Sequence, residues 1–255
     1  MSANPLAGLR IGAVSYLNTK PLIHSLESRA LTLEVPARLA ARFLAGELDA
    51  ALLPVFAILE AGSGCLVDDV AIACRGEVFS VVVASQGEFS DAKEIYLDPS
   101  SRSSSALLRV LSAEFYPGCH RLLESAAIPE GAARLLIGDP AIAFRRHHGA
   151  TWNYHDLGSL WLRHTGLPFV FAVWALATEN KSVGDAFRAA KEVGLQAREE
   201  IAASCDDPEF VSHYLSAYIQ FGLGLEEKKG LKRFETLARR HGVLPLGGPA
   251  GISWN

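Results

Sequence analysis

Small polar side chains gather in three segments that each follow a predicted strand, and a ligand could bind there. The richest is residues 100–105, where five serines surround Arg102 just before a predicted helix. Hydroxyl groups at a helix N-terminus lie beside unpaired N–H groups and the positive end of the helix dipole, which together favour an anion. Because one serine is enough to cap a helix, the excess of hydroxyls predicts that the turn at residues 100–105 binds an anion. The alternative is a helix cap with a flexible loop.

The other two segments offer fewer groups. In residues 15–21, Asn18 and Thr19 supply an amide and a hydroxyl, and Pro21 suits a first helical turn. On general grounds a capping turn without a ligand explains this pattern at least as well. In residues 138–140, Asp139 is first of all a candidate helix N-cap. Its carboxylate could instead accept a hydrogen bond from a ligand hydroxyl, a role that suits an anionic ligand poorly.

The common catalytic and cofactor motifs are absent from the sequence. It contains no GxxxxGK[ST], no GxGxxG after a strand, no HExxH and no GxSxG. The eight histidines show no metal-binding spacing, and the adjacent His147 and His148 would point about 100° apart on a helix. We therefore expect no metal site, and a kinase, dehydrogenase, metalloenzyme or serine hydrolase is disfavoured.

The composition is that of a folded globular protein. The 255 residues are 49% hydrophobic and 20% charged, so the chain can bury a large core and is not of the disordered class. The net charge is −4 and no basic run exceeds two residues, which disfavours a nucleic-acid partner. The longest apolar run, residues 168–176, fits a buried strand and is too short to cross a membrane.

The cysteines and the N-terminal residues bear on the compartment. The four cysteines, at positions 65, 74, 119 and 205, form no CxxC pair and are expected to be reduced core residues. Arg10 and Lys20 interrupt the early apolar stretch, so no signal peptide is predicted. Both observations lead us to expect a cytoplasmic protein.

Strands and helices alternate through most of the chain. Residues 9–14, 31–35 and 49–53 are predicted strands, each followed by a helical pattern or a helix-starting proline. Further strands are predicted at 78–84, 95–97, 134–137 and 168–176, and residues 182–240 are helical almost throughout. The alternation predicts an α/β fold with parallel sheets. We expect two lobes, the first of residues 1–84 plus 177–255 and the second of residues 85–176, with a ligand cleft between them.

Several segments together resemble one family. Residues 10–22, RIGAVSYLNTKPL, are similar to the opening signature of the chorismate dehydratases of the futalosine pathway of menaquinone biosynthesis. Further matches follow in the same order, and they are residues 76–80, 101–104, 136–139, 156–161 and 165–175. The resemblance spans residues 10 to about 176 and implies the type II periplasmic-binding-protein fold, which agrees with the two lobes.

The resemblance also implies a reaction and residues for it. Such enzymes remove water from chorismate to give 3-(1-carboxyvinyloxy)benzoate without a cofactor, and the enolpyruvyl carboxylate of the substrate is thought to act as the base. By position, Asn18 would be the catalytic residue that orients the reacting groups. The implied substrate contacts are Ser80, Ser103 and Ser104, with Gly138 and Asp139 in a matching segment and Arg102 at a position that the family fills loosely. Lys20 is a candidate from its location alone.

Two alternatives remain at this point. The 1,4-dihydroxy-6-naphthoate synthases of the same pathway are similar in fold, but they open with a Ser-Pro-Cys-Pro-Asn-Asp type turn and rely on a histidine, whereas this chain has SYLN at residues 15–18. A small-anion-binding protein without catalytic activity would share the fold too, although such proteins are normally exported. The dehydratase is the favoured interpretation, with chorismate as the partner and the oligomeric state open.

Overall fold

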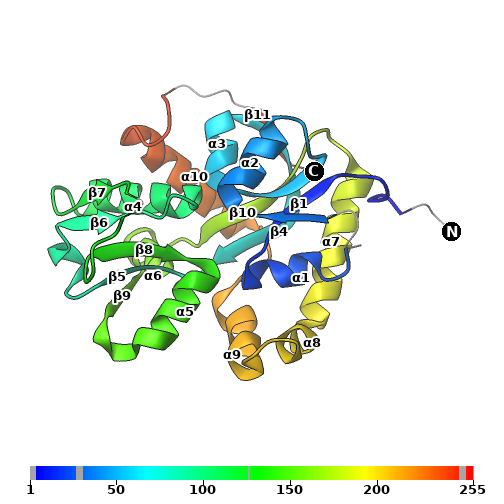
Figure 1. Cartoon of the computed structure of the whole chain (residues 1–255). Coiled ribbons are helices and arrows are strands. Elements are labelled where there is room, and N and C mark those ends of the chain that lie inside the picture. Colours follow the sequence, from blue (N-terminus) through cyan, green and yellow to red (C-terminus); the bar gives the residue numbers. More distant parts are fainter. Residues whose placement is uncertain (1–3, 27–30, 126, 247–250, 255) are drawn as a thin grey trace. The chain divides into compact units, whose positions relative to one another are not determined.

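The computed structural model describes residues 4–26, 31–125, 127–246 and 251–254 (Figure 1). It is an α/β protein with two compact units. The first consists of Met1–Ala73, Val170–Gly224 and Gly247–Asn255, and the second of Cys74–Phe169 and Leu225–Leu246. Since the chain leaves the first unit and re-enters it, each unit is assembled from segments far apart in the sequence.

The first unit contains a six-stranded sheet in the order β11-β4-β10-β3-β1-β2. The strands are β1 Ile11–Val14, β2 Leu31–Glu34, β3 Ala50–Pro54, β4 Ser63–Cys74, β10 Phe169–Leu176 and β11 Gly251–Trp254. β1 runs parallel to β2 and β3, whereas β10 runs antiparallel to β3. The sheet is therefore mixed: the expected parallel pairing is present between β1 and its neighbours, whereas the antiparallel β10 was not expected. Every residue of β3 is buried, as expected for an apolar strand that is covered on both faces.

Helices complete the first unit. They are η1 Leu17–Thr19, α1 Lys20–Ile23, α2 Pro36–Leu44, α3 Val55–Ala61, α7 Lys181–Gln196, α8 Arg198–Ala203 and α9 Pro208–His213, the last running into a π-helical turn at Tyr214–Tyr218. α7 packs closely on α1, since a Cβ atom on Gly194 would lie 1.7 Å from the carbonyl oxygen of Pro21. The same helix covers β10, where Phe187 stacks on the fully buried ring of Trp174.

The second unit contains a five-stranded sheet in the order β7-β6-β8-β5-β9. Its strands are β5 Val81–Ser85, β6 Glu94–Tyr96, β7 Arg121–Leu123, β8 Ala133–Ile137 and β9 Asn153–Asp156. Its helices are α4 Arg102–Phe115, α5 Gly138–His148, α6 Leu157–Thr165 and α10 Leu225–Arg240, with short 3-10 turns at Phe89–Asp91 and Gly149–Thr151. β6 runs parallel to β8, whereas β5 runs antiparallel to β8 and β9, so this sheet is mixed as well.

Three elements, β5, β10 and α10, belong to the other unit than the one in which they were expected. β5 was expected in the first lobe, but it pairs with β8 and β9. β10 was expected in the second lobe, but five of its residues pair with β3. α10 was expected with the other C-terminal helices, but it packs on the second unit, where Arg240 pairs with Glu114 of α4 at 2.9 Å.

The four cysteines are free thiols. Cys65 and Cys74 are buried as expected, whereas Cys119 and Cys205 are only half-buried. No helix of the described residues is both long and apolar enough to span a bilayer.

Candidate functional site

One edge of the five-stranded sheet collects most of the predicted ligand-binding residues. Pairing of Val81 with Ile137 and of Val82 with Asp156 puts the start of β5 beside the carboxyl ends of β8 and β9. Because β6 is parallel to β8, its carboxyl end reaches the same edge. Three helices, α4, α5 and α6, begin within a few residues of these strand ends. Ligands of open α/β sheets bind beyond such strand ends, so this edge is the candidate site of the second unit.

The serine-rich turn at the start of α4 is partly self-supporting. The carboxylate of Asp98 accepts hydrogen bonds from the Ser100 amide at 2.8 Å and the Ser100 hydroxyl at 2.6 Å. Ser101 is the N-cap, and its hydroxyl accepts a hydrogen bond from the amide of Ser104 at 3.3 Å. The Ser105 hydroxyl donates to the backbone carbonyl of Asp98 at 3.3 Å. Three of the five serines thus stabilise the turn itself. Their hydroxyls are therefore not an excess that only a bound anion would explain.

Ser103 and Ser104 occupy the first turn of α4 and are each 4% exposed. Arg102 is the first residue of the helix and is half-buried. The three residues therefore share a helix N-terminus, as the sequence predicts. Their role toward an anion stays a prediction.

Ser80 lies at the same edge, just before β5, and is 1% exposed. Its amide donates to the carbonyl of Val78 at 2.7 Å, and Phe79 between them has a φ of 65°. A hydrogen bond from residue i+2 to residue i across a residue with positive φ is a γ-turn, which is strained for any residue with a Cβ atom. The carbonyl of Ser80 in turn accepts a hydrogen bond from the Gly138 amide at 2.8 Å, so these two predicted site residues are in direct contact.

Asp139 is not the N-cap of α5. The N-cap position belongs to Ile137, whose side chain makes no capping hydrogen bond, and Gly138 with a φ of 58° is the first helical residue. The helix therefore starts two residues earlier than an Asp139 cap would place it, and glycine adopts the positive φ at its first position without strain. Asp139 is therefore the second helical residue, where its exposed carboxylate faces the favourable end of the helix dipole.

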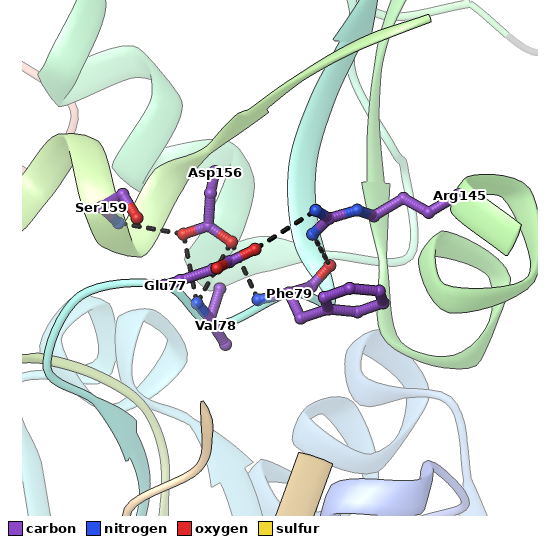
Figure 2. A network of polar contacts seen from close by, with 6 residues as sticks. All are labelled: Glu77, Val78, Phe79, Arg145, Asp156 and Ser159. Atoms are coloured by element: carbon purple, nitrogen blue, oxygen red, sulfur yellow. Dashed lines mark hydrogen bonds and ion pairs between the residues drawn. The ribbon is translucent and has the colours of Figure 1, made fainter. Parts of the chain in front are cut away.

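A buried carboxylate, Asp156, lies where β9 meets α6 (Figure 2). One oxygen accepts the Ser159 amide at 2.9 Å and so caps α6. The other oxygen accepts the Phe79 amide at 2.8 Å, and the Val78 amide lies 3.1–3.2 Å from both oxygens. Burial raises the pKa of Asp156 to about 6, and the backbone donors offset only part of this effect.

Arg145 of α5 holds the same turn from a second direction (Figure 2). Its guanidinium donates to the Phe79 carbonyl at 3.0 Å and to the Glu77 carboxylate at 3.2 Å. It also lies 3.8 Å from the centre of the Phe79 ring, a cation–π distance. Phe79 is thus held through its amide, its carbonyl and its ring.

Asn18 belongs to the first unit, where η1 follows β1. Its side-chain Oδ1 is buried and has no hydrogen-bond partner among the described residues. The Oγ1 of the fully buried Thr19 is likewise without a partner in that part of the chain. Lys20, a candidate by location, donates to the Cys205 thiol at 3.2 Å. An unpartnered buried oxygen is what a ligand-binding amide would show, because the ligand supplies its partner.

Asp156 and Arg145 are not among the predicted site residues, although Asp156 opens the matching segment 156–161. The pattern Asp-Leu-Gly-Ser at residues 156–159 is a recognisable N-cap signal, since aspartate is a favoured cap residue. The bonds from Asp156 to Val78 and Phe79 join residues nearly eighty positions apart, and no local pattern announces them. Within the described ranges, no three histidine, cysteine or acidic side chains gather closely enough to hold a metal ion.

Comparisons with known proteins agree with this architecture. The family model described as menaquinone biosynthesis matches residues 9–240. The chain is 31% identical to the chorismate dehydratase of Thermus thermophilus, an alignment that covers 88% of this chain and 93% of that protein. It is 28% identical to the chorismate dehydratase of Campylobacter jejuni, over 88% and 94%.

Two solved structures are similar in fold. A protein from Archaeoglobus fulgidus superposes with a TM-score of 0.71 at 15% identity, over 92% of this chain and 98% of that one. The periplasmic aliphatic sulphonate binding protein of Escherichia coli gives 0.61 at 15% identity, over 95% of both chains. The fold is therefore that of periplasmic binding proteins, as expected.

Proposed function

The chain belongs to the menaquinone biosynthesis family, and we propose that it is a chorismate dehydratase. The observation that carries the proposal is the alignment with the Thermus thermophilus enzyme over nearly the full length of both chains. The reaction is a loss of water: the ring carbon that bears the ether gives up a proton, the neighbouring carbon gives up its hydroxyl as hydroxide, and the ring becomes aromatic. The products are 3-(1-carboxyvinyloxy)benzoate and water, so the enzyme would be a carbon–oxygen lyase.

We further propose that the substrate supplies its own base through the enolpyruvyl carboxylate. The protein then needs to hold a dianion in a reactive conformer, and positioning alone contributes up to roughly 7–11 kcal/mol in favourable cases. Neutral donors suit this task, because they bind a carboxylate without protonating it. The buried hydroxyls of Ser80, Ser103 and Ser104 support this mechanism, since they place neutral donors at one sheet edge.

The roles of the individual residues are part of the proposal. Ser103 and Ser104 would bind one carboxylate at the start of α4, with Arg102 adding charge. Ser80 and Gly138 would contact the substrate from the adjoining turn. The exposed carboxylate of Asp139 would accept a hydrogen bond from the hydroxyl of the substrate, since it would repel the substrate's carboxylates. Asn18 would orient the reacting groups, and its unpartnered Oδ1 supports that role.

The test is to mix the purified chain with chorismate and follow the mixture by mass spectrometry. We expect a product lighter by one water, formed in proportion to enzyme concentration. Chorismate that remains unchanged at high enzyme concentration would overturn the proposal. Binding of chorismate without turnover would instead identify a small-anion-binding protein, and conversion of a cyclic futalosine derivative alone would identify the naphthoate synthase. We propose a cytoplasmic location, as expected for an enzyme that acts on a biosynthetic intermediate.

A further inference from the structure

We propose that Asp156 is a positioning residue for the reaction: its carboxylate holds the Ser80 loop, residues 76–80, in the conformation that presents Ser80 to the substrate. The inference rests on the proposed function, because it takes Ser80 to be a substrate contact. Asp156 itself would act through the loop.

The loop needs an external restraint. Phe79 has a φ of 65°, a value that residues with a Cβ atom adopt rarely and keep only where the surroundings impose it. Such strained residues concentrate at functional sites. The Ser80 amide bonds back to the Val78 carbonyl, so a change at Phe79 would redirect Ser80 directly.

Asp156 supplies the restraint from the side of the amides. Oδ2 of its carboxylate accepts hydrogen bonds from the successive N–H groups of Val78 and Phe79 in the loop. Oδ1 accepts a hydrogen bond from the Ser159 amide, which fixes the carboxylate to the start of α6 (Figure 2). Val78 is buried, so its N–H group would have no water to replace this acceptor. Bonds to an ionised acceptor are stronger than neutral ones, which suits the carboxylate to the task.

The backbone at the start of α6 packs directly against the backbone of the loop. A Cβ atom on Gly158 would lie 2.3 Å from the Gly76 carbonyl oxygen and 2.5 Å from the Cys74 sulfur. Because only glycine permits this approach, the start of α6 and the Ser80 loop are in close contact next to Asp156. On the other side, the Ser80 carbonyl accepts from Gly138, so the restraint extends to the first residue of α5.

The charged and titratable groups around Asp156 come from several elements. Burial is the main cause that raises the pKa of Asp156, and the negative charge of Glu77 on the loop raises it further. Arg145 from α5 pairs with that Glu77 carboxylate. Cys74, at the end of β4, has a thiol pKa raised by burial and by the Asp156 charge. A pocket of about 430 Å³ beside Asp156 is also lined by Glu88, His155 and Arg163. Below a pH of about 6 Asp156 is neutral, and the fold as a whole gains stability because a buried neutral carboxyl costs less than a buried charge. The N–H groups of the loop nevertheless lose their ionised acceptor, so the loop should loosen.

Asp156→Asn is the informative variant. Asparagine caps a helix about as well as aspartate, so α6 keeps its cap, but one oxygen becomes an NH2 group that faces the donor N–H groups of the loop. Asp207→Asn is the matched control: Asp207 caps α9 in the same manner, accepting from the Phe210 amide at 3.0 Å.

We expect kcat/KM for chorismate to fall at least about tenfold in Asp156→Asn, mostly through kcat, and to stay close to the parent value in Asp207→Asn. The acid limb of the parent pH profile, with a midpoint near 6, should disappear in Asp156→Asn. Amide hydrogen exchange at Val78 and Phe79 should become faster, because the two N–H groups lose their acceptor. Unchanged exchange there, or an unchanged acid limb, would overturn the inference.

A measurement on the parent chain keeps the test independent of whether the variant folds. The amide NMR resonances of Val78 and Phe79 should titrate together with a midpoint near pH 6. Their constancy between pH 4 and 8 would refute the role of Asp156. If the parent does not convert chorismate while these amides titrate and exchange faster in the variant, the proposed function fails and the restraint on the loop stands.

Discussion

Asn18→Ala should leave the stability of the fold unchanged or raise it, while it sharply lowers the rate of turnover. The Oδ1 atom of Asn18 is buried without a hydrogen-bond partner among the described residues. A buried acceptor that has lost water without gaining a partner costs roughly 1–3 kcal/mol. Alanine removes that cost and loses some packing, so we expect the free energy of unfolding to stay level or rise by about 1 kcal/mol. For a chain of this length the melting temperature would rise by roughly 2–4 °C at most.

The same substitution should nearly abolish turnover. Removing one oriented polar group from an active site typically lowers kcat by about 10²–10³-fold. If Asn18 orients the reacting groups of chorismate, its loss should therefore act more on kcat than on substrate binding. A residue kept only for packing would show the reverse, with an intact kcat and a less stable fold.

The assay combines urea unfolding, thermal unfolding and steady-state kinetics on one preparation. Tyr154→Phe is the control, because Tyr154 of β9 is not among the proposed substrate contacts and also carries a buried oxygen without a partner in the described part of the chain. It should stabilise the protein by a similar amount and leave kcat near the parent value. A destabilised Asn18→Ala protein with normal kcat would refute the reasoning.

Four further predictions follow from the same structure. Replacing Ser103 and Ser104 together by alanine should weaken chorismate binding by about 1–3 kcal/mol in calorimetry, and an unaltered Kd would move the anion site elsewhere. Gly194→Ala should lower the urea midpoint, because its Cβ would lie 1.7 Å from the Pro21 carbonyl oxygen and overpacking of about 1–3 kcal/mol outweighs the helix-propensity gain of about 1 kcal/mol. Burial raises the pKa of Asp156 from 3.8 to about 6, so the stabilisation that its neutral form contributes is complete only below pH 3.8 and is lost as the pH rises through 6. Relative to Asp156→Asn, the parent should lose about 2 kcal/mol of unfolding free energy between pH 4 and 7 in urea titrations. Turnover should survive exhaustive EDTA treatment, and a loss that a divalent ion restores would contradict the prediction of a metal-free enzyme.

Features that depend on neighbouring residues could be predicted from the sequence. Pro36 begins α2, and the serine-rich segment begins α4 with Ser101 as its cap, since a helix start depends on a few adjacent side chains. The apolar run at residues 50–53 forms the buried strand β3 because a strand covered on both faces needs apolar residues throughout. The family resemblance was likewise present in short collinear motifs, and the match over residues 9–240 confirms it.

Strand pairing was decided by the tertiary structure alone. The apolar strands β5 and β10 suit either sheet equally well by composition. Only the observed pairing of β5 with β8 and β9, and of β10 with β3, shows to which sheet each belongs. β4 was missed because Asp68 and Asp69 interrupt its apolar pattern, and Asp69 takes a φ of 59° there. Within the strand, Asp69 is paired with the buried Lys191 of α7 at 2.8 Å, more than a hundred residues away.

The restraint on the Ser80 loop is the clearest case of a feature outside the reach of local patterns. Asp156 has the sequence signature of a helix cap and performs that task. Its second task depends on β9 lying beside β5, which brings a carboxylate to two amides nearly eighty residues earlier in the chain. Sequence patterns report the local conformational preference of a segment, whereas a strained turn such as that at Phe79 exists only because distant groups outweigh that preference.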